Sequence, residues 1–183
     1  MKSLKPDHFL GVDGGGSGTR LTLTDGHLKI LGTKKCASPS ALSLGIARSW
    51  ENILNATKEL FLEKSLPFNP QNVALGLGLS GANNTLWKEE FIKLDPGFLS
   101  LALDTDGLTT LLGAHNGKPG VIIALGTGSV GLKLGPQGIR QDVSGWGFPA
   151  GDEASGAWIG LRAFALTQKA LDHRLPFSKL SRD

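Results

Sequence analysis

The chain lacks the features that mark secreted, membrane-bound and metal-cluster proteins. One cysteine, Cys36, occurs among 183 residues, which excludes an internal disulfide and leaves no Cys/His set of the kind that binds a metal. Residues 1–7 contain no apolar signal core, and the longest aliphatic runs, such as 121–125, are far too short to cross a bilayer. These absences predict a reducing, cytoplasmic setting and no membrane partner.

Charge of one sign is also scarce. The 19 Lys and Arg residues and the 16 Asp and Glu residues leave a net charge of +3, and Lys34-Lys35 is the only basic pair of note. Nucleic-acid-binding domains present a much denser basic surface, so no nucleic-acid partner is expected. The four histidines are dispersed and have no plausible Ser or Cys partner, which indicates surface or core roles.

Glycine, in contrast, is abundant, and its 26 copies gather at turns between apolar segments. Residues 13–19 and 126–129 form two glycine-rich turns, each between an apolar run and an alternating segment, which predicts strand–turn–strand loops. Glycine lets backbone N–H groups approach an anion, and Ser and Thr hydroxyls add donors, so the loops predict a polyphosphate held from two sides. The expected phosphate-binding residues are Gly14, Gly15, Gly16, Ser17, Gly18, Thr19, Gly126, Thr127, Gly128 and Ser129.

The first loop could also be a tight β-hairpin that binds no ligand, although such hairpins need only one or two special positions. Carboxylates accompany this loop. Asp13 could form an Asx turn, but a carboxylate beside a phosphate loop also suits Mg²⁺ bound through water. Farther along, Asp104-Thr105-Asp106 closes a strand and opens a helix. Helix capping explains one of these aspartates, and Asp106 is the expected general base for an attacking hydroxyl.

A third patch combines glycine, aromatic and acidic residues at positions 145–147 (Gly-Trp-Gly) and 151–153 (Gly-Asp-Glu). Taken singly, Trp146 could be a core residue, and the acids could favour the N-terminus of the next helix. Together they are typical of a sugar site, where an aromatic ring faces C–H groups and carboxylates accept hydrogen bonds from hydroxyls.

Apolar periodicity divides the chain into two parts. Residues 1–115 follow the order β-β-β-α-β-α-β-α, which predicts an α/β domain with a mixed five-stranded sheet and helices on its faces. After a linker at 116–120, a similar strand and glycine-turn pattern returns, so residues 116–183 look like the incomplete beginning of a second, similar lobe. The expected strands are 9–12, 21–24, 28–31, 73–79, 99–103, 121–125, 130–134 and 139–143. One expected helix begins at residue 46 and is ended by Pro67 and Pro70, and the others cover 84–94, 107–114 and 154–171.

One glycine pattern supports a different class of protein. Residues 76–81 match G-x-G-x-x-G and precede a helix and a strand that ends in Asp104 and Asp106, as in dinucleotide-binding oxidoreductases. Residues 126–131 match it too, but a strand follows where a helix is required. Because the fingerprint normally opens its domain, and a β-meander comes first here, dinucleotide binding is the weaker alternative.

The order of these motifs resembles that of the BadF/BadG/BcrA/BcrD-type ATPase family, and within it the N-acetylglucosamine and glucosamine kinases of the actin, sugar kinase and heat-shock chaperone superfamily. The resemblance implies a two-lobed ribonuclease H-like (actin-like ATPase) fold that uses ATP and Mg²⁺. It also implies transfer of the γ-phosphoryl group to the 6-hydroxyl of an amino sugar. The motifs that carry it are Phe9 to Gly16, Leu79-Ser80-Gly81, Thr105-Asp106-Gly107, Ala124 to Ser129 and residues 145–153.

The resemblance implies roles for single residues, with Asp106 as catalytic base. Relatives offer an asparagine to the sugar near residues 37–42, where this chain has Ser38-Pro39-Ser40, so the preferred sugar stays open. Relatives also continue past the position of Asp183, so the chain resembles an N-terminal half-enzyme. A non-catalytic sugar- or phosphate-binding fragment is the alternative, and exposed sheet edges predict aggregation or a homodimer. The implied sugar site is Ser40, Ser80, Gly81, Asp106, Gly145, Trp146, Gly147 and Asp152.

Overall fold

The computed structural model describes residues 5–15, 18–36 and 45–179. The chain forms two compact units, Met1–Thr110 (unit 1) and Leu111–Asp183 (unit 2), and each is described by itself. The division falls inside helix α4. The domain boundary expected between residues 115 and 116 stays a prediction.

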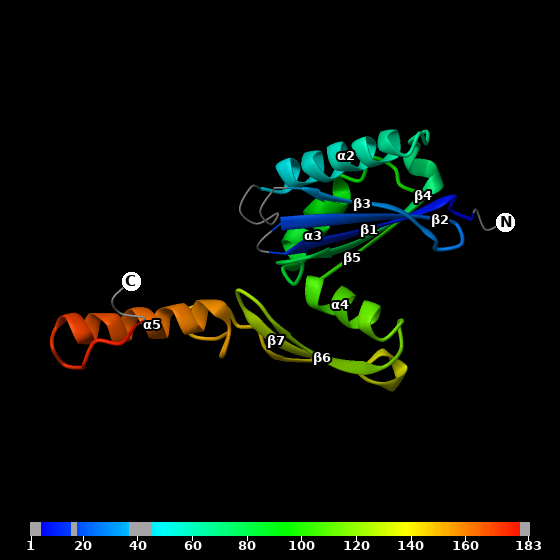
Figure 1. Ribbon diagram of the computed structural model, residues 1–183. Coiled ribbons are helices and arrows are strands. Elements are labelled where there is room, and N and C mark those ends of the chain that lie inside the picture. The colour runs from blue at the N-terminus through cyan, green and yellow to red at the C-terminus, as the bar shows by residue number, and fades with distance from the viewer. Residues whose placement is uncertain (1–4, 16–17, 37–44, 180–183) are drawn as a thin grey trace. The chain divides into compact units, whose positions relative to one another are not determined.

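Unit 1 is built on a mixed five-stranded sheet with the strand order β3-β2-β1-β4-β5 (Figure 1). The first three strands pair antiparallel, whereas β4 pairs parallel with both β1 and β5. The predicted mixed α/β sheet is therefore confirmed. Its elements are β1 (His8–Gly15), β2 (Gly18–Asp25), β3 (Ile30–Cys36), α2 (Ile46–Glu63), β4 (Val73–Leu79), α3 (Thr85–Lys93), β5 (Ser100–Asp104) and α4 (Asp106–Ala114), with the short 3₁₀ helix η1 (Pro70–Asn72) before β4.

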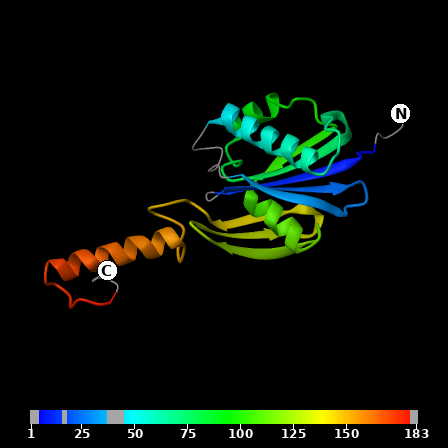
Figure 2. The ribbon, with the colours of Figure 1, turned by 45° about the horizontal axis from the view of Figure 1, so that its top comes forward.

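Helices α2 and α3 cover one face of this sheet and share one hydrophobic core with it (Figures 1 and 2). Helix α2 buries Trp50, Ile53, Leu60 and Phe61, which helical spacing places on one side, as the sequence predicts. Trp50 stacks on Phe91 of α3 with ring centroids 4.7 Å apart, and its Nε1 donates to the Phe91 carbonyl oxygen at 2.6 Å. The hydrogen bond satisfies the buried indole N–H, so the ring can serve as a core residue.

The start of α4 packs on β4 through a glycine. A Cβ atom built on Gly78 would lie only 1.9 Å from Oγ1 of Thr109, so the helix approaches the strand more closely than any side chain would allow. The strands β1, β4 and β5 are parallel, and their carboxyl ends meet at one edge of the sheet. Helix α4 begins at that edge, immediately after β5.

Strand β3 is longer and later than expected. The sequence predicts a strand over 28–31, but residues 25–29 form the turn, in which the Asp25 carboxylate accepts hydrogen bonds from the N–H groups of His27 and Lys29. The strand then continues through Lys34 and Lys35 to its end. An edge strand can carry such lysines because one side of its backbone is not covered by a neighbour, so apolar alternation is a weak guide there.

Unit 2 contains a three-stranded antiparallel sheet in the order β6-β7-β8, followed by a long helix. The predicted meander and helix are confirmed with small shifts at their ends. None of the helices formed by the described residues of the chain is both long and apolar enough to cross a membrane. The elements are β6 (Gly120–Leu125), β7 (Ser129–Leu134), the short 3₁₀ helix η2 (Pro136–Gly138), β8 (Arg140–Ser144) and α5 (Gly156–Leu171).

Candidate functional site

The first glycine-rich turn is the tip of the β1–β2 hairpin. Gly14 pairs with Thr19 and Gly15 with Gly18, while the predicted ligands Gly16 and Ser17 between them lie outside the described residues. A side chain at Gly14 would collide with Leu79, since its Cβ would come 2.6 Å from a Leu79 methyl carbon. The hairpin therefore needs glycine for packing as well as for its turn, and phosphate binding by this loop stays a prediction.

The loop after β4 is tied to this hairpin. The backbone N–H of Ser80 donates to the carbonyl oxygen of Gly14 at 2.8 Å, and Gly81 adopts a left-handed φ of 90°. Ser80, expected at the sugar site, is thus held next to Gly14, a residue expected at the phosphate site. Ser40, also expected at the sugar site, lies outside the described residues.

A cavity of about 260 Å³ opens beside the hairpin. It includes Asp13, the expected metal residue, and three residues for which the sequence suggested no ligand role. Those three come from the start of β2 and the end of β3, so only the cross-strand register could have placed them beside the loop. The residues that line the cavity are Asp13, Gly15, Gly18, Thr19, Arg20, Lys35 and Cys36.

Asp106, the expected base, stands at the first residue of α4, near the same hairpin. A Cβ atom built on Gly15 would lie 4.0 Å from Oδ2 of Asp106. The other carboxylate oxygen, Oδ1, accepts a hydrogen bond from the Gly107 N–H at 2.9 Å. One oxygen is thus held by the helix backbone, while the other points toward the glycine turn.

The N-cap of α4 is Thr105, between the two aspartates of the Asp104-Thr105-Asp106 motif, which corrects the expectation that capping explains one of the aspartates. Thr105 accepts the N-cap hydrogen bond, from the Leu108 N–H to its Oγ1 at 3.2 Å. Asp104 instead lies 3.4 Å from the Lys88 ammonium and accepts from the Thr105 N–H at 2.8 Å. The two aspartates therefore have separate environments, one paired with a cation and one beside the glycine turn.

The surroundings of Asp106 raise the pKa of its carboxyl group above 3.8, the ordinary value for an aspartate. Burial is the largest cause, the Gly107 N–H opposes it, and the negative charge of Asp13 raises the pKa further. A carboxylate with a raised pKa is a stronger proton acceptor than an ordinary one. The same residues thus favour the role of general base.

Titration of the Asp106 carboxyl should report this environment. We expect a midpoint above 3.8 in carboxyl-detected NMR, because burial disfavours the charged form. The Asp13→Asn variant should lower that midpoint, since it removes the nearby negative charge. Because the pKa of Asp106 is raised in the folded chain, its protonated carboxyl group stabilises the fold. This contribution is complete below the pKa of the unfolded chain and is lost as the pH rises through the higher pKa of the folded chain.

The control for this titration is Glu51→Gln, an exposed residue of α2, which covers the opposite face of the sheet. It removes one negative charge but should leave the Asp106 midpoint in place. An Asp106 midpoint at or below 3.8, or equal shifts in the two variants, would contradict the proposed environment.

The second glycine-rich turn joins β6 and β7 in unit 2 and is fastened to α5. The N–H groups of Gly156 and Ala157, in the first turn of α5, donate to the carbonyl oxygens of Gly126 and Thr127 at 2.8 and 3.1 Å. Two of the helix's N–H groups that lack an intrahelical partner are thereby satisfied. These two hydrogen bonds attach the turn to the start of the helix, and phosphate binding by this turn stays a prediction.

Asp152 lies against this second turn. A Cβ atom built on Gly128 would come 2.7 Å from Oδ2 of Asp152, and the aspartate is buried with a left-handed φ of 62°. The sequence assigned Gly128 to the phosphate and Asp152 to the sugar. In unit 2 the two expected sites therefore adjoin.

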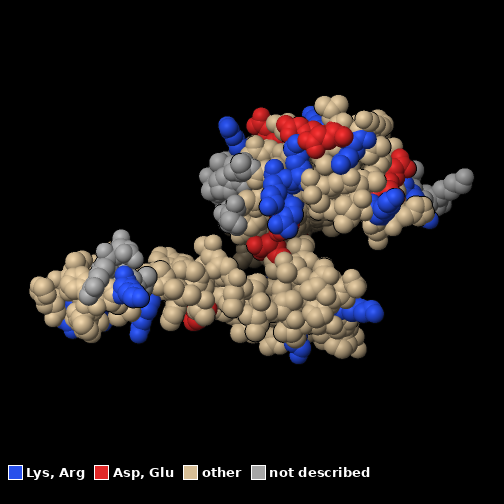
Figure 3. Space-filling model, in the orientation of Figure 1, with Lys and Arg blue, Asp and Glu red and all other residues tan. Residues whose placement is uncertain are grey.

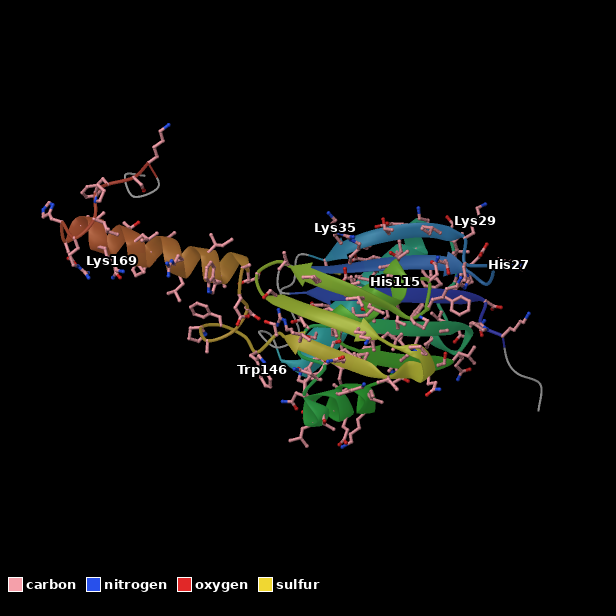
Figure 4. All side chains as sticks on the ribbon, turned by 90° about the horizontal axis from the view of Figure 1, so that it is seen from below. His27, Lys29, Lys35, His115, Trp146 and Lys169 are labelled. Carbon is pink, nitrogen blue, oxygen red and sulfur yellow. The ribbon has the colours of Figure 1, made fainter. Side chains whose placement is uncertain are left out.

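Trp146 lies on the surface of unit 2 and not in a core (Figure 4). Its side chain is 90% exposed, and both neighbouring glycines have positive φ values, 76° at Gly145 and 86° at Gly147. The Ser144 hydroxyl donates to the Glu153 carboxylate at 2.8 Å, which ties the two ends of this segment together. Sugar binding by the exposed ring stays a prediction.

The dinucleotide alternative fails on the position of its glycines. In that fingerprint the first glycine makes a tight turn after a strand, but Gly76 and Gly78 both lie inside β4. The glycine at 78 is required by the contact with α4. Packing therefore explains the glycine at residue 78, and a left-handed φ of 90° explains the glycine at residue 81.

Comparison with known proteins decides the family. The BadF/BadG/BcrA/BcrD ATPase family matches residues 10–181. The chain belongs to this family. The glucosamine kinase GspK of Vibrio cholerae is 31% identical over 175 residues, which are 95% of this chain and 59% of that protein. The N-acetyl-D-glucosamine kinase of Dictyostelium discoideum is 27% identical over 94% of this chain and 58% of its own length.

A solved structure is also similar to this chain. It is a candidate N-acetylglucosamine kinase from Chromobacterium violaceum, with 50% identity and a TM-score of 0.91 over 97% of this chain and 62% of that one. A Porphyromonas gingivalis structure with 19% identity and a TM-score of 0.68 supports the fold alone. The chain thus spans about three-fifths of the length of these relatives.

Proposed function

We propose that this chain carries the phosphate-binding and catalytic-base part of an ATP-dependent amino-sugar kinase that phosphorylates the 6-hydroxyl of glucosamine or N-acetylglucosamine. The observation that carries the proposal is the Asp106 carboxylate, whose pKa is raised and whose Oδ2 points toward the β1–β2 glycine hairpin. Membership of the BadF-type family and its similarity to a glucosamine kinase and an N-acetyl-D-glucosamine kinase support the same function.

In this proposal, Asp106 accepts the proton of the sugar hydroxyl as that oxygen attacks the γ-phosphorus and the bond to the β-phosphate oxygen breaks. The backbone N–H groups and hydroxyls of the two glycine turns orient the phosphates. Holding the reacting groups in line, with little motion left to lose, supplies much of the rate.

Asp13 is the proposed residue for Mg²⁺. Among the described residues, no group of three His, Cys, Asp or Glu side chains could hold a metal ion, but Mg²⁺ commonly needs only one or two carboxylates with phosphates and waters. The exposed carboxylate of Asp13 on the cavity wall fits that requirement. When bound, the ion would neutralise phosphate charge during transfer.

The amino sugar is assigned to Ser80, Gly81 and Asp106 in unit 1, and to residues 145–147 with Asp152 in unit 2. The exposed Trp146 ring can pack on the apolar face of a sugar, and a carboxylate can accept hydrogen bonds from its hydroxyls. Sugar-dependent ADP release with each acceptor distinguishes glucosamine from N-acetylglucosamine.

The same proposal covers the fold of the complete enzyme. We infer that unit 1 is a ribonuclease H-like lobe and that the β6-β7-β8 meander begins a second lobe of similar plan. In support, both meanders have a glycine-rich turn between their first two strands. A protein of this kind would work in the cytoplasm, where ATP is plentiful.

The test is release of ADP by this chain from ATP and Mg²⁺ with glucosamine, N-acetylglucosamine or glucose as acceptor. We expect release that depends on an amino sugar, with the product phosphorylated at its 6-hydroxyl by phosphorus NMR. Release that ignores the sugar would contradict the kinase assignment. Sugar binding without any release would favour a non-catalytic binding module instead.

A further inference from the structure

The cavity beside the first glycine turn contains two cations that the kinase proposal leaves unused. Arg20 of β2 pairs with Asp13 of β1 on one side and with Lys35 of β3 on the other. Residues directly opposite each other in antiparallel strands point to the same face of a sheet. Asp13, Arg20 and Lys35 therefore form a row across three strands, and all three line the cavity of about 260 Å³.

The neighbouring lysine shows that this arrangement is specific to one face. Lys34 points to the opposite face, where its ammonium lies 3.0 Å from Glu59 and 2.5 Å from Glu63 of α2. No ion pair between described residues of the chain involves Arg20 or Lys35. Figure 4 places Lys35 at the end of the sheet, and Figure 3 shows basic side chains gathered beside the acidic surface of α2.

Two like charges on directly opposed residues destabilise a sheet unless something neutralises them. Asp13 supplies one negative charge against two positive ones, so the row keeps an excess of positive charge. The cavity walls add Thr19 and glycine backbone, which offer hydrogen-bond donors to an anion without the bulk of side chains. The negatively charged oxygens of a phosphate group match both the excess positive charge and the hydrogen-bond donors of this cavity.

We propose that Arg20 and Lys35 form the subsite for the terminal phosphate of a bound nucleoside triphosphate, with Lys35 positioning that phosphate from β3. This inference rests on the proposed kinase function and adds residues to it. The guanidinium can bind two phosphate oxygens at once, and the ammonium acts as a point charge beside it. Both side chains are exposed, so they can reach the anion with little cost to the fold.

The lone cysteine gives a direct readout of this subsite. Cys36 is the only cysteine in the chain and lines the same cavity, so a bound anion should slow its alkylation by iodoacetamide. Burial raises the pKa of its thiol, so the reaction is run at alkaline pH. The probes are inorganic tripolyphosphate and ATP. Each protein's rate with the probe is divided by its rate without it, and calorimetric titration measures the same affinities independently.

Lys35→Gln is compared with Lys34→Gln, which removes the same charge from the adjacent residue on the other face. We expect tripolyphosphate and ATP to protect Cys36 in the unaltered chain and in Lys34→Gln. In Lys35→Gln and Arg20→Gln, half-maximal protection should require roughly tenfold more probe, since a charge-assisted contact to phosphate is lost. Equal affinities in Lys35→Gln and Lys34→Gln, whether both normal or both weakened, would overturn the proposal.

The outcome is separable from that of the kinase assay. Lys35-dependent protection by tripolyphosphate, combined with no sugar-dependent ADP release, would keep the anion subsite and reject the kinase. Sugar-dependent release with the same Michaelis constant for ATP in Lys35→Gln and Lys34→Gln would keep the kinase and reject the subsite.

Discussion

Replacing Asp106 by Asn should lower phosphoryl transfer by about 10²–10⁴-fold, the usual contribution of a positioned general base. Asparagine keeps the shape of the side chain, and its carbonyl oxygen can still accept from the Gly107 N–H, which bonds Oδ1 at 2.9 Å. What is lost is the ability to take a proton from the sugar hydroxyl. The affinity for the sugar should therefore change little, while kcat falls.

The matched control is Asp104→Asn, two residues earlier in the same motif. Its carboxylate faces the Lys88 ammonium at 3.4 Å, so its loss should reduce stability slightly and leave most of the activity. The measurement is kcat for sugar-dependent ADP release, with sugar affinity from calorimetry. Full activity in Asp106→Asn would place the base elsewhere, and equal losses in both variants would indicate a structural effect.

The local sequence pattern was sufficient to predict most of the fold. Helical spacing places Trp50 and Leu60 of α2 on one face, and both are buried there. Strands β1, β2, β4 and β5 were found because each contributes apolar residues to the core, whereas the edge strand β3, which has no buried residue, was predicted too early in the chain. Such signals are local, since each element must bury one side whatever its partners are.

The features that the sequence did not predict depend on contacts between residues that are distant in sequence. The lysines at positions 34 and 35 read as a basic pair too small to bind nucleic acid. In the sheet, Lys34 lies beside the carboxylates of α2, whereas Lys35 lines the cavity. Arg20 joined the site through its register with Asp13 and Lys35. The spacing of these residues along the chain does not predict that register.

Capping was also misjudged for a physical reason. Aspartate and threonine both cap helices well, so Asp104-Thr105-Asp106 offers three candidates within one turn. The geometry selected Thr105, whose hydroxyl accepts from the Leu108 N–H. The choice matters for function because it leaves the Asp106 carboxylate oriented toward the glycine turn.

Gly78→Ala should damage both stability and activity, because a single methyl group there has no room. Its Cβ would lie 1.9 Å from Thr109 Oγ1 and 2.8 Å from Thr109 Cβ, so α4 would have to move away from β4. Overpacking of this kind costs about 1–3 kcal/mol of unfolding free energy. Because Asp106 begins the same helix, displacement of α4 would also misplace the base and lower kcat.

Gly76→Ala is the control, two residues earlier in β4 and on the same face of the strand. A Cβ built there meets nothing within 4 Å, so its unfolding free energy and its kcat should stay close to those of the unaltered chain. The double variant Gly78→Ala with Thr109→Ala should recover part of the loss, since the hydroxyl and methyl groups of Thr109 are removed while its Cβ remains. Urea unfolding measures the stability and ADP release the activity. Equal effects of the two single glycine variants would show that the contact between β4 and α4 does not explain the glycine at residue 78.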